Sequence, residues 1–271
     1  MSAFYAVPAL VRAGHPGPCA VVAAGVTLLA VAVGLTPGRV VAVAAAVLAG
    51  QLSIGWSNDW FDAGRDAAAG RTDKPVASGA VPVRAVAYAA LLAAATTTVL
   101  SLALGWFAGG LHLVGVAAGW LYNWPLKATA ASVLPYLVGF GVLPGFVVAA
   151  GGAAPAWWLL TAGALLGAGA HFANVLSDFG EDLSTGVRGL PHRLGPAVSR
   201  WTAVGLLLAT GAVLVFGPGR PVGWAPWLVL IGSAVALLGA ILTRHRFGER
   251  LLFRVVLTVA LLDVGLLIAA G

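Results

Sequence analysis

Residues 41–66 read VAVAAAVLAGQLSIGWSNDWFDAGRD, an apolar run that ends in acidic and amide side chains. An apolar run of this kind can cross a hydrocarbon layer of about 30 Å as a helix. Residues 159–182 repeat the arrangement, since they read LLTAGALLGAGAHFANVLSDFGED. The chain therefore contains two apolar segments that each run into a polar cluster.

The two clusters match at an offset of 116 residues. Each has one Asn and two Asp at four-residue spacing, namely Asn58, Asp62 and Asp66 in the first and Asn174, Asp178 and Asp182 in the second. The windows 58–79 and 174–195 share seven identities over 22 positions, where chance would give roughly two. We therefore interpret residues 1–271 as a single transmembrane domain with two pseudo-repeated halves, each carrying one motif.

The composition excludes a soluble globular protein. Hydrophobic residues make up 60% of the chain, charged residues make up 9%, and the mean hydropathy is +0.97. So few polar side chains cannot cover the surface of a globule of this size. The sequence predicts an all-α, polytopic membrane protein.

We predict nine transmembrane helices in one bundle, near residues 18–36, 38–62, 83–107, 108–123, 132–152, 155–178, 198–217, 223–243 and 251–270. The division of 83–123 rests on the Gly-rich break GWFAGG, so eight spans remain an alternative. In this arrangement each polar cluster lies at a helix end and runs into a basic loop, near 63–82 and 179–200.

Basic side chains are distributed unevenly over the predicted loops. With nine spans, one side of the membrane holds 13 of the 15 Lys and Arg residues, and the other side holds Arg39 and Arg220. Because cytoplasmic loops carry the excess of basic residues, we predict that both clusters face the cytoplasm. The net charge of +6 then reflects topology and contact with anionic lipid, and we expect no nucleic acid partner.

The clusters have the chemistry of a magnesium site. Residues four apart advance by only about 40° around a helix, so each cluster forms one stripe. Carboxylates at the membrane boundary are usually functional, although solvated helix caps are the alternative interpretation. Oxygen ligands without a Cys/His set favour Mg²⁺, which typically bridges protein carboxylates to substrate phosphates. Basic side chains near the clusters would complement phosphate oxygens: Arg65, Arg71, Lys74, Arg188 and Arg193.

Such an assembly could remove diphosphate from an allylic carbon, because metal and basic groups stabilise the departing charge. Aromatic side chains beside the first cluster could shield the resulting carbocation, or they could form an interfacial belt: Trp56, Trp60 and Phe61.

These motifs resemble those of the UbiA family of intramembrane prenyltransferases, and the resemblance covers nearly the whole chain. The family pattern N-D-x-x-D-x-x-x-D is matched by Asn58, Asp59, Asp62 and Asp66. A basic R-T-x-R-P-like segment follows as Arg71–Pro75, with Lys74 in place of the second Arg. The second motif, D-x-x-x-D, is matched by Asp178 and Asp182. The family also has a Tyr followed by a Lys in its middle cytoplasmic loop, and this pair is matched by Tyr122 and Lys127.

The resemblance implies a nine-helix bundle with both motifs on its cytoplasmic face. It implies that two Mg²⁺ ions are held by Asn58, Asp62, Asp66, Asn174, Asp178 and Asp182, which would form the catalytic centre. It also implies that Arg71, Lys74 and Lys127 bind diphosphate and that Asp59 supports the site. We add Arg65, Tyr122, His171 and Arg188 as candidate substrate-binding residues.

We predict an Mg-dependent prenyltransferase that transfers the chain of an isoprenoid diphosphate to an aromatic or other lipophilic acceptor. One alternative is a UbiA-type terpene cyclase, in which the cation is attacked by its own chain. A less favoured alternative is a cation-coupled transporter built on inverted repeats. Both clusters are predicted to point to the same side of the membrane, which argues against inverted repeats.

Four further residues allow two interpretations each. His171 could remove a proton from an acceptor, but a neutral, hydrogen-bonded packing role is favoured. Asp263, alone in the last span, is expected to be a buried carboxylate with an interhelical hydrogen bond rather than a second site. Arg12 and His15 could contact an acceptor or anchor the chain at the interface.

Overall fold

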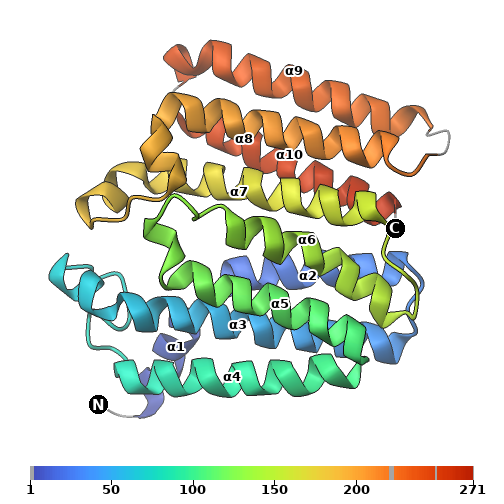
Figure 1. The fold of residues 1–271 in the computed structure, drawn as a ribbon. Helices are drawn as coiled ribbons and strands as arrows, with labels where there is room; N and C mark the ends of the chain where they lie inside the picture. The colour runs from blue at the N-terminus through green and yellow to red at the C-terminus, as the bar shows by residue number, and fades with distance from the viewer. Residues whose placement is uncertain (1–2, 220–222, 248, 271) are drawn as a thin grey trace. The chain divides into compact units, whose positions relative to one another are not determined.

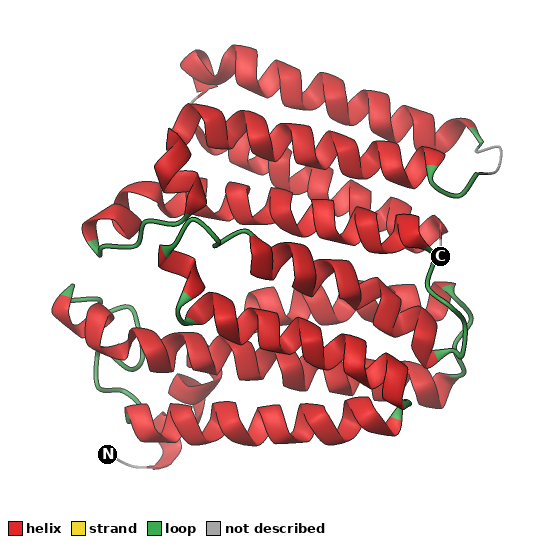
Figure 2. Ribbon diagram, in the orientation of Figure 1, coloured by secondary structure: helices red, strands yellow, loops and turns green. Residues whose placement is uncertain are grey.

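The computed structural model describes residues 3–219, 223–247 and 249–270. Throughout these residues the chain consists of helices joined by turns and loops, with no strand among them (Figure 2). The all-α prediction is confirmed for this part of the chain. Arg220, used above to assign the sides of the membrane, lies outside the described residues.

The helices follow one another along the whole chain (Figure 1). In order they are α1 (Ala3–Ala13), α2 (Pro16–Ala32), α3 (Pro37–Ala68), α4 (Val83–Ala103), α5 (Trp106–Asn123), α6 (Leu134–Ala150), α7 (Trp157–Ser184), α8 (Leu190–Phe216), α9 (Trp224–Phe247) and α10 (Glu249–Ala270). A short 3-10 turn covers Leu126–Ala128 between α5 and α6. Each predicted span overlaps one of the helices α2 to α10.

Five of the described helices are long and apolar enough to cross a membrane, namely α3, α4, α7, α8 and α9. A sixth candidate is the bent pair of α1 and α2, whose axes differ by 63°. A polytopic membrane protein is therefore supported, whereas the total of nine spans stays a prediction. The break in 83–123 is present, because α4 ends at Ala103 and α5 begins at Trp106 after Gly105 at φ 116°.

The chain divides into two compact units. The first lies within Met1–Leu126 and Phe146–Ala153, and α3 is its central helix, in contact with α1, α2, α4 and α5. A core cluster of Ala9, Ala13, Val81 and Val86 joins α1 to α4 and to the loop before it. At Gly55 of α3 even a single added carbon would overlap the carbonyl oxygen of Gly14, so the backbone between α1 and α2 lies directly on α3.

The second unit lies within Lys127–Gly145 and Ala154–Gly271. Helix α7 packs against α8 and α10, and α9 packs against α8 and α10. The four helices share one apolar core, formed by Leu166, Ala173, Val204, Leu207, Leu237, Ala240, Ile241, Val256 and Val259. Helix α8 kinks at Gly195, whose φ of 80° lies in the left-handed region.

Helices α3 and α7 end in the same way, at positions that match in the repeat. Gly70 and Gly186 both have a left-handed φ, of 67° and 82°. The next amide bonds back to the carbonyl oxygen of the last Asp in each cluster, from Arg71 to Asp66 at 3.0 Å and from Val187 to Asp182 at 2.9 Å. This is the Schellman arrangement, which needs a residue that adopts positive φ at little cost.

The predicted start of each basic loop was therefore too early. The loops expected from residues 63 and 179 begin only after Ala68 and Ser184, because the helices persist until these glycines. Both polar clusters are consequently helical over their full length.

Candidate active site

The first polar row lies on the last three turns of α3, where its members share one face of a continuous helix. Asp62 and Asp66 are buried, and Asn58 is half-buried. Asp62 forms an ion pair with Arg65, with 2.6 Å between Oδ2 and Nη2. The carboxylate of Asp66 forms no hydrogen bond or ion pair with any described residue, whereas its backbone carbonyl oxygen accepts from the Arg71 amide. Arg65, predicted to bind substrate, is thus engaged by a neighbouring carboxylate.

Asp59 joins three segments of the first unit. Its Oδ1 accepts from His15 Nε2, between α1 and α2, and from Lys74 Nζ, in the loop after α3, each at 2.9 Å. The Asp59 side chain is buried, so the Lys74 ammonium group compensates its charge, and the His15 ring adds a hydrogen bond. The supporting role predicted for Asp59 thus has a geometric basis, and we name this arrangement the Asp59 clasp, formed by His15, Asp59 and Lys74.

The basic loop after α3 is held in place by its own ion pair. Arg71 donates two hydrogen bonds to the carboxylate of Asp73, at 3.0 and 2.9 Å, and they lower the pKa of Asp73 to about 2. Arg12 of α1 donates to the Asp73 carbonyl oxygen at 3.2 Å. Arg12 and His15 therefore contact the basic loop and Asp59, respectively. The sequence alone did not indicate which groups these two residues contact.

Asn58 is held by a residue that sequence reasoning missed. Its Nδ2 donates to Oδ1 of Asn123, at the end of α5, over 3.1 Å. Asn123 is buried, and its own Nδ2 donates to the Ile54 carbonyl oxygen and to Ser57 Oγ, each at 2.8 Å. A signal was present in the sequence, because the chain has three Asn and the other two begin the polar clusters.

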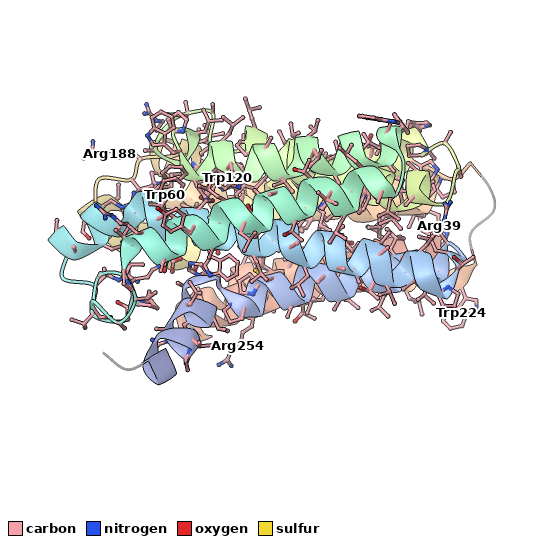
Figure 3. The ribbon with its side chains drawn as sticks, turned by 90° about the horizontal axis from the view of Figure 1, so that it is seen from below. Arg39, Trp60, Trp120, Arg188, Trp224 and Arg254 are labelled. Atoms are coloured by element: carbon pink, nitrogen blue, oxygen red, sulfur yellow. The ribbon has the colours of Figure 1, made fainter. Side chains whose placement is uncertain are left out.

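Aromatic rings gather beside the first row. Trp60 stacks on Phe61 with ring centroids 5.0 Å apart, and Trp120 of α5 meets both rings edge-on. Trp60 and Trp120 are labelled in Figure 3. Trp120 is oriented by a hydrogen bond from Nε1 to Ser53 Oγ at 2.9 Å. Trp56 instead donates to the Leu10 carbonyl oxygen at 2.8 Å, so it serves the packing of α1 on α3.

The second polar row lies on the last turns of α7, in the second unit. Asn174 and Asp178 are exposed, and Asp182 is half-buried. His192, at the start of α8, places Nε2 3.5 Å from Asp182 Oδ2, and its ring lies 4.8 Å from that of Phe179. No pattern in the sequence indicated His192, because the matching position of the first motif is Val76.

His171 is fully buried in this unit, and its contacts are compatible with the favoured packing interpretation. Its Nε2 lies 3.0 Å from Ser132 Oγ, and its ring lies 4.7 Å from that of Tyr136. The Ser132 hydroxyl also accepts a hydrogen bond from the amide of Leu190 at 2.8 Å. His171 thereby helps to fix the start of α8 and the segment before α6.

The remaining predicted substrate-binding residues lie at helix ends and in loops. Tyr122 is in the last turn of α5, in the first unit, and Lys127 is in the 3-10 turn, in the second. Arg188 is exposed just before α8 (Figure 3), and its carbonyl oxygen accepts from Arg193 Nε at 3.1 Å. Gly189 lies against the Lys127 backbone, since a carbon added there would be 2.7 Å from the Lys127 carbonyl oxygen.

Asp263 follows the prediction only in part. It is buried in α10 beside Gly211 of α8, as expected, but its Oδ2 has no hydrogen-bond partner among the described residues, so the expected interhelical hydrogen bond is not seen at this oxygen. A carbon added at Gly211 would lie 3.2 Å from Asp263 Oδ1, so α8 and α10 approach closely here. Asp263 belongs to α10, whereas the two polar rows lie on α3 and α7, so it is distant from both rows along the chain.

The first row suits a magnesium ion. Among the described residues no three His, Cys, Asp or Glu side chains form a metal-binding group by themselves. Magnesium commonly takes only one or two protein carboxylates and completes its shell with water and substrate phosphate. Asp66 is a buried carboxylate without a bonded partner among the described residues, an arrangement that is costly unless a cation compensates it. The donor chemistry of this row therefore fits Mg²⁺.

Comparisons with known proteins identify the family of the chain. The sequence matches the UbiA prenyltransferase family over residues 18–262. It is 34% identical over 251 residues to the bacteriochlorophyll synthase 33 kDa chain of Cereibacter sphaeroides, covering 83% of this chain and 76% of that protein. It is 33% identical over 245 residues to digeranylgeranylglyceryl phosphate synthase of Methanopyrus kandleri, covering 86% and 88%.

Solved structures show the same fold at lower sequence identity. A UbiA homologue from Archaeoglobus fulgidus bound to GPP and Mg²⁺ has a TM-score of 0.73 at 15% identity, over 97% of this chain and 99% of that one. A UbiA homologue from Aeropyrum pernix has a TM-score of 0.71 at 19% identity, over 90% and 95%. With its two Asp-rich motifs on the ends of α3 and α7, this chain belongs to the UbiA prenyltransferase family.

Proposed function

We propose that this chain is an Mg²⁺-dependent intramembrane prenyltransferase that ionises an isoprenoid diphosphate and passes the prenyl chain to an aromatic or other lipophilic acceptor. The observation that carries the proposal is the pair of matched Asn/Asp rows on α3 and α7 in a UbiA family member. Relatives support it, because solved UbiA homologues are bound to GPP with Mg²⁺ and to DMAPP with Mg²⁺.

The proposed roles follow from the chemistry of each group. When bound, Mg²⁺ neutralises the diphosphate and stabilises its departure with the electron pair of the broken carbon–oxygen bond. The ions would be held by Asn58, Asp62, Asp66, Asn174, Asp178 and Asp182. Basic groups would bind the diphosphate oxygens: Arg71, Lys74, Lys127 and Arg188. A new bond then forms from the acceptor to the allylic carbon, and the acceptor loses a proton.

The aromatic cluster would give the prenyl chain an apolar surface beside the first row. The faces of Trp60, Phe61 and Trp120 offer apolar contact to an isoprenoid and stabilise positive charge on the allylic carbon. The uneven distribution of Lys and Arg supports placing this chemistry at the cytoplasmic face.

The test is a product assay on the purified full-length protein. It would be incubated with Mg²⁺ and prenyl diphosphates of several chain lengths, with and without a lipid extract, while pyrophosphate release is measured and products are identified by mass spectrometry. Asp62→Ala and Asp178→Ala are each expected to lower the rate of release at least a hundredfold. Asp263→Asn, far from both motifs in sequence, is the control and should retain most of the rate.

The same assay separates the alternative functions. If Asp62→Ala and Asp178→Ala release pyrophosphate at the wild-type rate, the assignment of these residues to a metal site is wrong. Cyclic terpenes formed without added acceptor would favour a cyclase, which the intact ionisation chemistry allows. Mg²⁺-independent uptake of a solute by proteoliposomes, without pyrophosphate release, would favour a transporter.

A further inference from the structure

We infer that Asn123 is a positioning residue that fixes the amide of Asn58 so that the Asn58 oxygen, and not its nitrogen, is presented to the cation of the first motif. The inference deepens the proposed function and depends on it for the role of Asn58 as a ligand. It concerns α3 and α5, which pack together within the first unit.

The direction of the hydrogen bonds around Asn123 is set by the α3 backbone. The Ile54 carbonyl oxygen can only accept, so it requires the Asn123 nitrogen at its 2.8 Å contact. Ser57 donates its one hydroxyl proton to the same carbonyl oxygen at 2.8 Å. Ser57 Oγ must therefore also accept at its 2.8 Å contact with Asn123 Nδ2. Both protons of the Asn123 amide are thus used by α3.

The orientation of Asn58 follows from that of Asn123. Since the Asn123 nitrogen is committed to Ile54 and Ser57, its oxygen faces Asn58 and accepts from Asn58 Nδ2 over 3.1 Å. Rotating the Asn58 amide would bring two carbonyl oxygens together, one of them on a side chain only 4% exposed. The Asn58 oxygen is therefore directed to the other side of its amide, which a hard cation requires of an Asn ligand.

Among the described residues, the second motif has no equivalent of Asn123 that bonds to Asn174. Asn174 is exposed, and its side chain forms no hydrogen bond with a described residue. The position that matches Asn123 at the offset of 116 is Gly239, which has no side chain. Asn58 and Asn174 therefore occupy matching positions in the repeat, but only the amide of Asn58 is held in one orientation by a described residue. Substitutions of Asn174 are accordingly the matched control for substitutions of Asn58.

The experiment measures Mg²⁺ binding to the purified full-length protein by isothermal titration calorimetry, without prenyl diphosphate. A carboxylate is ordinarily the stronger Mg²⁺ ligand. Asn174→Asp is therefore expected to bind Mg²⁺ as tightly as wild type or more tightly. Asn58→Asp is expected to bind at least tenfold more weakly, because its carboxylate would face the fixed oxygen of Asn123 at about the 3.1 Å now spanned by a hydrogen bond.

Removing Asn123 completes the test. In the Asn58→Asp, Asn123→Ala double variant the opposing oxygen is gone, so affinity should recover by at least threefold relative to Asn58→Asp. Circular dichroism and size-exclusion chromatography establish that each variant is folded. If Asn123→Ala does not fold, the comparison of Asn58→Asp with Asn174→Asp still tests the positioning role of Asn123, because neither variant changes Asn123.

Failure of the inference and failure of the proposed function give different results. Equal affinities for Asn58→Asp and Asn174→Asp, with binding lost in Asp62→Ala, would overturn the positioning role and leave the metal site intact. Unchanged Mg²⁺ binding in both Asp62→Ala and Asp178→Ala would overturn the proposed function, and with it the premise of this inference.

Discussion

The Asp59 clasp makes the stability of the first unit depend on Lys74. Replacing Lys74 by Met removes one partner of an ion pair in which Asp59 Oδ1 and Lys74 Nζ are 2.9 Å apart, with the two side chains 2% and 19% exposed. At an effective dielectric constant of about 20, unit charges at this distance attract by about 6 kcal/mol. Part of this attraction offsets the cost of removing both groups from water.

The variant leaves the Asp59 charge buried, with His15 as its other partner. Removing one member of a buried pair typically costs about 3–5 kcal/mol. Because His15 still donates a hydrogen bond to the Asp59 carboxylate, we expect Lys74→Met to lower the free energy of unfolding by about 3 kcal/mol, at the lower end of this range. Denaturation in mixed micelles without substrate, followed by circular dichroism, would measure the change independently of any effect on diphosphate binding.

Two control variants isolate the ion pair. Lys74→Arg keeps the charge and should stay within about 1 kcal/mol of wild type. Arg84→Met removes one positive charge from the first turn of α4, which follows the loop that contains Lys74. Arg84 is exposed and has no bonded partner among the described residues, so this variant should be close to neutral. A Lys74→Met protein as stable as Arg84→Met would refute the reasoning, since the clasp would then contribute nothing to stability.

Two further predictions concern backbone contacts in each unit, measured by the same unfolding assay. Gly55→Ala should destabilise by about 1–3 kcal/mol, because the added methyl group meets backbone that cannot move aside, whereas Gly64→Ala, which meets nothing within 4 Å, should be neutral or stabilise by up to about 1 kcal/mol. Ser132→Ala should cost about 1–3 kcal/mol, because it leaves a buried amide and His171 without their shared partner. The exposed Ser177→Ala should change stability by less than about 0.5 kcal/mol, and equal losses for both serines would contradict the bridging role.

Much of the site was predictable because its pattern is local. Asn58, Asp62 and Asp66 share a face whenever their segment is helical, and the apolar run before them makes it so. Gly70 and Gly186 match in the repeat and end both helices with a positive φ, as expected of glycines at this position. The exact lengths of the basic loops were not predictable, because charged residues continue a helix as readily as they form a loop.

The sequence by itself determined that the chain is helical and membrane-embedded, and that it carries two matching rows of Asn and Asp side chains, because hydropathy and four-residue spacing act within a single helix. Only the tertiary structure decided which groups hold these rows. The partners of Asn58 and Asp59 are Asn123 and His15, which are 65 and 44 residues away along the chain. Such pairs depend on how α3 packs against α5 and on the bend between α1 and α2, and no local pattern encodes that packing.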